Sequence, residues 1–150
     1  MVVAGFVAPY LLDTTTRFVE AAAGLPDVRL ALVTCEPADR LPPRLEGRLA
    51  GHWRVDDPLD AGQIAGAVEG LSAQLGPVQR LLAVLEQLQV PMALVREHLG
   101  IPGMDAATAR NFRDKDHRRR HGHHPPPRAV HGPGNRPALR GRPPPVRGLR

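Results

Sequence analysis

Short apolar runs alternate with segments of helical periodicity through the first 115 residues, and this alternation restricts the chain to few folds. Residues 2–8 and 28–34 are nearly uninterrupted apolar runs, as expected for parallel strands that are covered on both faces. Residues 53–56 and 78–85 are candidates for a third and a fourth strand. The four runs predict one sheet whose strands are joined by longer connections.

The segments between these runs carry the spacing of amphipathic helices. A first helix is predicted after Pro9, with Asp13 or Thr14 as its N-cap. Two later helices repeat apolar residues at i, i+4, i+7 and i+11, and Pro91 is expected in the first turn of the second. The apolar positions, in chain order, are Phe18, Val19, Ala22 and Leu25; Ile64, Val68, Leu71 and Leu75; and Leu88, Met92, Val95 and Leu99.

The order strand, helix, strand, strand, helix, strand, helix is typical of βαβ units. It predicts an α/β fold with a small open parallel sheet, and right-handed crossovers place helices on both faces. Residues 35–51 are rich in Pro, Arg and Gly and are predicted to form a loop, with a short helix over 43–50.

Composition changes sharply after Lys115. Residues 1–115 hold 11 basic and 14 acidic residues, a formal charge of −3, whereas residues 116–150 hold nine Arg and one Asp, a charge of +8. In the second stretch 27 of 35 residues are Arg, Pro, His or Gly, too little apolar surface to offset the entropy of ordering a chain. We therefore predict an α/β domain over 1–115 and a disordered tail over 116–150.

Several broad classes are disfavoured. The apolar run at the N-terminus is too short to span a bilayer and has no basic residues before it, so neither a membrane segment nor a signal peptide is predicted. The single cysteine, Cys35, fits a reducing compartment, and a cytoplasmic location is expected. The turn after the first strand contains no glycine, which argues against binding of a dinucleotide.

Ligands of such sheets bind at the carboxyl ends of the strands, where Glu86 follows the predicted fourth strand. Its carboxylate could accept hydrogen bonds from a ligand amine or hydroxyl, or it could be a solvated residue that opens a helix. Thr14 to Thr16 could bind an anion or simply cap a helix, and Cys35, His52 and Trp53 are interpreted as mainly structural. No catalytic set and no metal site is predicted.

Two motifs connect the chain to a known family. Leu99-Gly-Ile-Pro-Gly103 is followed by a predicted helix that ends in Asn111-Phe-Arg-Asp-Lys115. Together with Glu86 and the strands before it, this stretch resembles the N-terminal, Rossmann-like pre-ATP-grasp domain of ATP-grasp ligases, the group that contains biotin carboxylase, carbamoyl-phosphate synthetase and carboxylate–amine ligases. The resemblance covers most of residues 1–115, and its specific part is 99–115.

The resemblance implies roles for two residues. The family lysine that matches Lys115 contacts nucleotide phosphates, and Glu86 falls near the pocket for the carboxylate substrate. The parent enzyme would use ATP and Mg²⁺ to phosphorylate a small carboxylate, which an amine then attacks. In the family, further α+β lobes supply the Mg²⁺ ligands and clamp the nucleotide. Because positioning and charge neutralisation drive phosphoryl transfer, this chain alone, as a truncated domain, is expected not to turn over ATP.

Residues 116–150 allow three interpretations. A shifted reading frame would replace the expected catalytic lobes with Arg- and Pro-rich sequence. A genuine basic arm would bind nucleic acid through phosphates, making the protein a small α/β interaction module for RNA or another polyanion. The third interpretation is loose metal capture by the histidines of the tail, which are His117, His121, His123, His124 and His131.

Overall fold

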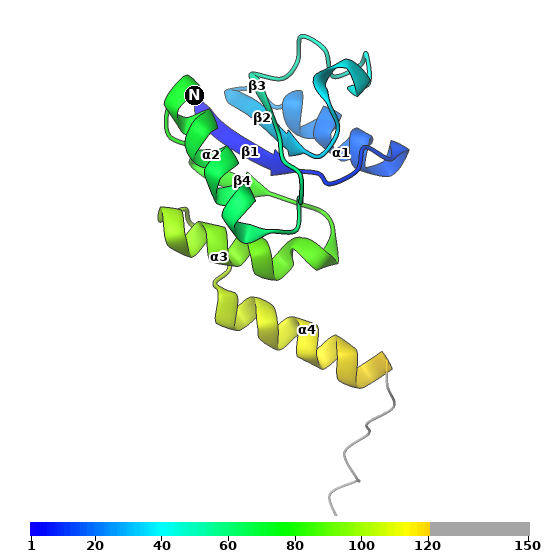
Figure 1. The fold of residues 1–150 in the computed structure, drawn as a ribbon, viewed down its shortest axis with the longest axis vertical. Coiled ribbons are helices and arrows are strands. Elements are labelled where there is room, and N and C mark those ends of the chain that lie inside the picture. The colour runs from blue at the N-terminus through cyan, green and yellow to red at the C-terminus, as the bar shows by residue number, and fades with distance from the viewer. Residues whose placement is uncertain (121–150) are drawn as a thin grey trace, which may run out of the picture.

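The protein, seen here as a computed structural model, is described for the backbone of residues 1–120 and for side chains up to Asp114. Four strands form one fully parallel sheet in the order β3-β2-β1-β4, which confirms the predicted α/β class (Figure 1). The elements are β1 (Val2–Val7), α1 (Asp13–Ala23), β2 (Val28–Thr34), η1 (Ala38–Arg40), β3 (Gly51–Arg54), α2 (Ala61–Leu75), β4 (Arg80–Leu82), η2 (Glu86–Leu88), α3 (Gln89–Leu99) and α4 (Ala106–Arg120).

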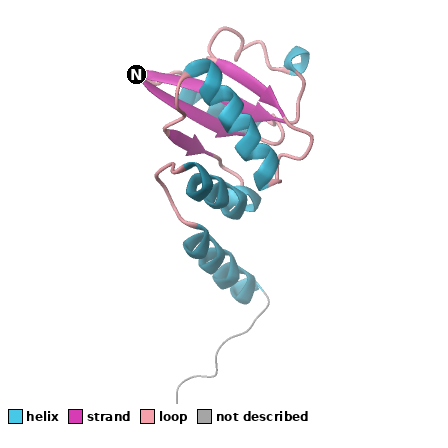
Figure 2. Ribbon diagram, turned by 60° about the vertical axis from the view of Figure 1, so that its left-hand side comes forward, coloured by secondary structure: helices cyan, strands magenta, loops and turns pink. Residues whose placement is uncertain are grey.

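Both faces of the sheet are covered, as the apolar runs require. Alternate residues of β1 and β2 point to opposite faces, so Ala4 and Leu30 contribute to the core beneath α1. Val3 and Val33 contribute to the opposite core, which α2 and α3 cover. Figure 2 shows α2 lying across this second face. Burial on both sides explains why these strands read as continuous apolar runs.

The two helices on the second face agree with the predicted spacing. Ile64, Val68 and Leu71 of α2 are buried, and α3 buries Met92 and Val95. The Asp60 side chain caps α2 by accepting a 3.0 Å hydrogen bond from the backbone N–H of Gln63. Gly100 ends α3 in the left-handed region, at φ 66°, as a helix C-terminal glycine commonly does.

The prediction for α1 is wrong in its cap and only partly right in its face, since Val19 and Ala22 pack on the core and Leu25 is 53% exposed. Leu12 is the N-cap and provides no side-chain hydrogen bond, and Asp13 is already helical. The buried side chains are Thr15, Thr16 and Val19, whereas Phe18 remains 52% exposed. Thr16 can be buried because its hydroxyl donates to the Leu11 carbonyl at 3.4 Å. A threonine can be buried when its hydroxyl has a nearby hydrogen-bond acceptor, and the spacing of apolar residues does not predict such burial.

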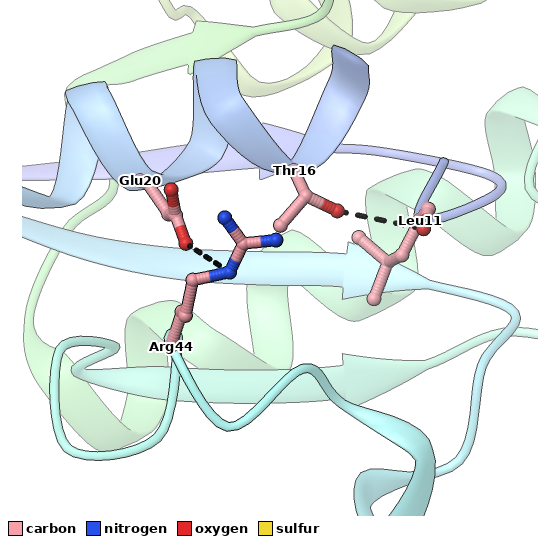
Figure 3. Close-up of polar contacts among 4 residues, drawn as sticks. All are labelled: Leu11, Thr16, Glu20 and Arg44. Carbon is pink, nitrogen blue, oxygen red and sulfur yellow. Dashed lines mark hydrogen bonds and ion pairs between the residues drawn. The ribbon is translucent and has the colours of Figure 1, made fainter. Parts of the chain in front are cut away.

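The short helix predicted over 43–50 is not formed. Gly47 has φ 74°, which a right-handed helix does not accommodate, and residues 43–48 form turns. Leu45 of this segment is completely buried against the α1 face of the sheet. Arg44 of this segment also forms a 3.3 Å ion pair, between its Nε and Oε1 of Glu20, with α1 (Figure 3). Thr16 lies one helical turn before Glu20.

β4 is shorter than predicted. Only Arg80–Leu82 pairs with β1, so the stretch 83–85 is outside the strand, and Glu86 follows four residues after it rather than directly. Beyond β1 the chain reaches Pro9, which has no N–H with which to extend a ladder.

α4 packs on α3 through Ala106 and Ala109 against Ala93, and then extends away from the sheet (Figures 1 and 2). Its backbone runs through Arg120, so the change in composition after Lys115 falls inside a helix. The rest of the predicted tail lies outside the described residues. Within residues 1–120, no helix is both long and apolar enough to cross a membrane.

Candidate functional site

The strand order defines one edge of the sheet as the expected binding site. From β1 the chain passes through α1 to β2 on one side, whereas β4 lies on the other side of β1 and is reached from β3 through α2. The connections after β1 and β4 therefore diverge at a topological switch point, where open α/β sheets bind ligands. The segments at this point are 8–12 and 83–88.

The connection after β1 is fixed to the end of β2. The Pro9 carbonyl accepts hydrogen bonds from the hydroxyl of Thr34 at 3.3 Å and from the thiol of Cys35 at 2.7 Å. Burial, with a smaller contribution from Glu36, raises the pKa of the Cys35 thiol. A thiol with a raised pKa is a poor nucleophile at neutral pH, so the geometry agrees with the structural role predicted for Cys35.

β3 contributes His52 and Arg54 to the same half of the sheet. Arg54 Nε donates to the Cys35 carbonyl at 3.1 Å and so joins the ends of β2 and β3. Nε2 of His52 is buried, with no hydrogen-bond partner among the described residues. Burial lowers the pKa of His52, and a hydrogen bond with the Glu36 backbone opposes this shift less strongly. His52 is thus favoured in its neutral form, as a packed side chain would be.

Glu86 opens η2 and is exposed at the carboxyl edge. Apolar side chains accompany it on the same connections: Tyr10 is 58% exposed, Leu12 68% and Val84 42%. The sequence pattern wrongly assigned Val84 to a buried strand, and it made no prediction for the exposure of Tyr10 and Leu12. The edge therefore combines a carboxylate with an apolar surface, an arrangement suited to a ligand that has an apolar body and an amine or hydroxyl.

Lys115 lies in the second half of α4, on a different element from Glu86. The described side chains end at Asp114, so the structure describes the backbone position of Lys115 and not its contacts. Up to Asp114, no group of three or more His, Cys, Asp or Glu residues could hold a metal ion. The tail histidines proposed for metal capture lie largely beyond the described part of the chain.

A cavity lies beside β4, on the side of α3 and of the turn at 102–104. Its volume is about 330 Å³, and Arg96 of α3 contributes the half-buried charge in its lining. Sequence analysis did not identify this site. The only signal was a basic residue at i+4 from the buried Met92, a spacing that places Arg96 next to the core face of its helix.

No family model and no curated protein matches this chain. Function is therefore inferred from the fold and from the residues at its sheet edge.

Proposed function

We propose that residues 1–115 are the N-terminal α/β domain of an ATP-dependent carboxylate–amine ligase-like protein of the ATP-grasp group, acting in the cytoplasm. The domain binds the small carboxylate substrate at the carboxyl ends of β1 and β4. In the complete enzyme ATP phosphorylates that carboxylate, and an amine then displaces the phosphate.

The main support for this proposal is the conformation of the turn between α3 and α4. Gly100 reverses the chain, and the N–H of Ile101 donates to the Arg96 carbonyl at 2.9 Å. Ile101 packs into the core, and Gly103 has φ 152°, so both glycines occupy conformations that other residues adopt rarely. The glycines of the Leu99–Gly103 motif are thus explained by backbone conformation, since they allow the chain to turn from α3 toward α4.

Two carboxylates, one on α3 and one just before α4, accept hydrogen bonds from the first turn of α4. The Glu97 carboxylate accepts a 2.8 Å hydrogen bond from the backbone N–H of Ala106. The Asp105 carboxylate accepts one at 2.7 Å from the N–H of Thr108, which lowers the pKa of Asp105. A helix fixed at its first turn would give Lys115 a defined position relative to the sheet. This arrangement supports the role that the resemblance gives to Lys115, an ammonium that contacts nucleotide phosphates.

The described residues do not fit a complete site for Mg²⁺ and ATP. They contain neither a carboxylate cluster for the metal nor a glycine-rich phosphate cradle, and they form a single α/β unit. Substrate positioning is what this domain itself would contribute, with Glu86 accepting a hydrogen bond from the amine or hydroxyl of the substrate.

Two measurements test the proposal. Purified 1–150 supplied with ATP, Mg²⁺, amino acids and small carboxylates should release no ADP above background; a clear rate would refute the statement that this chain is inactive alone. Translating the encoding DNA beyond codon 115 in the other two frames should reveal ATP-grasp sequence. If neither frame contains it, the assignment to the ligase group fails.

The position of α4 favours a second candidate, binding of RNA or another polyanion. The helix projects beyond α3 (Figures 1 and 2), Arg110 and Arg113 are exposed, and its sequence holds six basic and two acidic residues. Binding of single-stranded RNA would then weaken steeply with salt, because each phosphate contact releases a counterion. Binding that is absent at low salt, or insensitive to salt, would exclude this candidate.

A further inference from the structure

The cavity beside β4, named here the Arg96 pocket, is mainly apolar with basic groups. Its sides are β4, the connection after β4, α3 from Gln89 to Arg96 and the turn before α4. Two arginines and no acidic residue line it. The lining residues used below are Leu81, Leu85, Leu88, Met92 and Arg96.

Arg96 is only partly satisfied by the protein. Its Nη2 donates to the Leu81 carbonyl at 2.6 Å, the one hydrogen bond that its side chain makes among the described residues. Within the same part of the chain, the two ion pairs are Arg44–Glu20 and His98–Glu69, so no carboxylate neutralises Arg96. Burial lowers the pKa of Arg96, but a guanidinium remains charged at neutral pH. A half-buried charge is thus left with unused N–H donors beside apolar side chains.

The backbone near Arg96 is shaped to its side chain. A Cβ at Gly103 would lie 2.7 Å from Cδ and 2.8 Å from Nε of Arg96, closer than packed atoms approach. Glycine at position 103 therefore allows the backbone of the turn to lie close to Cδ and Nε of Arg96. The contact and the bond to Leu81 together hold the guanidinium at the cavity wall rather than in solvent.

We infer that the Arg96 pocket binds a small molecule with one carboxylate on a short apolar chain or ring. The planar guanidinium pairs with a carboxylate through parallel N–H···O bonds, and Leu85, Leu88 and Met92 provide the apolar contacts. A phosphate monoester suits the pocket less, because its charge of roughly −1.5 to −2 exceeds that of one guanidinium. Leu85 and Leu88 belong to the connection 83–88 at the carboxyl edge, so the pocket adjoins the substrate site of the proposed function. The inference uses Arg96 and the apolar lining, and it does not depend on the ligase chemistry.

Phenylacetate and its neutral counterpart phenylacetamide test the inference with the full chain. Titration followed by ¹H–¹⁵N NMR should show phenylacetate shifting amides of β4, α3 and residues 102–104, and phenylacetamide binding at least about tenfold more weakly, as expected for loss of a charged hydrogen bond. Arg96→Gln should weaken phenylacetate binding by about 10- to 100-fold. No saturable shift at millimolar phenylacetate, or equal binding of the amide, would overturn the inference.

Matched variants separate binding from folding and from the carboxyl edge. Arg29→Gln is the control, because Arg29 also donates to a single carbonyl, Leu75 at 3.2 Å, but lies outside the pocket. It should leave phenylacetate binding unchanged. If Arg96→Gln does not fold, Arg96→Lys retains the charge without the planar fork and should bind several-fold more weakly; wild-type affinity in that folded variant would count against the pocket. The tests of the proposed function, ADP release and the reading frames beyond codon 115, do not involve Arg96, so failure of this site is distinguishable from failure of the proposed function.

Discussion

Replacing Gly70 with alanine should test the packing of α2 on the sheet. A Cβ at Gly70 would overlap Cη2 and Cζ3 of Trp53 and lie 3.0 Å from Cζ2 of the same ring. Trp53 belongs to β3 and packs against the larger core, so moving its ring exposes apolar surface. Gly66 lies one helical turn earlier on α2 and is exposed, and a Cβ added there would meet no atom within 4 Å. Gly66→Ala is therefore a control for the same substitution.

Two effects oppose each other at Gly70. Glycine to alanine within a helix gains about 0.8–1.0 kcal/mol from propensity, and this term is common to both variants. Overpacking of a formed core costs about 1–3 kcal/mol and applies only to Gly70→Ala. We therefore expect Gly66→Ala to raise the free energy of unfolding by up to about 1 kcal/mol. Gly70→Ala should fall about 1–3 kcal/mol below that control and be destabilised relative to the wild type by up to about 2 kcal/mol.

Urea unfolding followed by circular dichroism at 222 nm measures both changes. Trp53 is the only tryptophan, so its fluorescence reports the same transition from the site of the contact. Repeating the pair in a Trp53→Leu background should remove most of the difference between the two alanine variants, because the overlapping ring atoms are absent. Equal stabilisation by Gly66→Ala and Gly70→Ala in the wild-type background would refute the packing described for Trp53.

Two further predictions concern a cap and a titration. Asp60→Ala should lower the free energy of unfolding by about 1 kcal/mol through loss of the α2 N-cap, and an unchanged urea midpoint would show that the bond to Gln63 contributes nothing. Because the pKa of His52 is lowered from 6.5 in the folded state, the unfolded state takes up its proton first as pH falls. Stability should therefore decline below about pH 6.5 and level off once folded His52 is also protonated. His52→Phe should remove this component of a urea series between about pH 5 and 8, and an identical pH dependence would contradict it.

The helices of the second face were predictable because their information is local. Ile64, Val68 and Leu71 repeat at helical spacing, and α2 buries that stripe against a sheet. In α1 the same reasoning identified Val19 but missed two buried threonines and wrongly included Phe18. α1 also contacts residues that are distant in the sequence, such as Arg44 in its ion pair with Glu20, and periodicity does not encode such contacts.

Some of the candidate sites could also be predicted from the sequence, and one could not. Glu86 could be selected from the sequence because any residue after a strand of a parallel sheet approaches one edge. The position of Lys115 on a helix also followed from its motif, and its role in nucleotide binding stays a prediction. The Arg96 pocket could not be found in this way, because β4, α3 and the turn at 102–104 form it only when the chain has folded.

The fold class follows from the amino-acid pattern alone: the alternation of apolar runs and helical stripes predicts a parallel sheet covered on both faces, since each pattern reflects burial of a local segment. Three features are visible only in the folded chain: the strand order β3-β2-β1-β4, the early end of β4 and the hydrogen bond from Arg96 to the Leu81 carbonyl. These features depend on pairing between segments far apart in the chain. Hydrophobic periodicity specifies which face of a segment is buried and not which distant partner covers it.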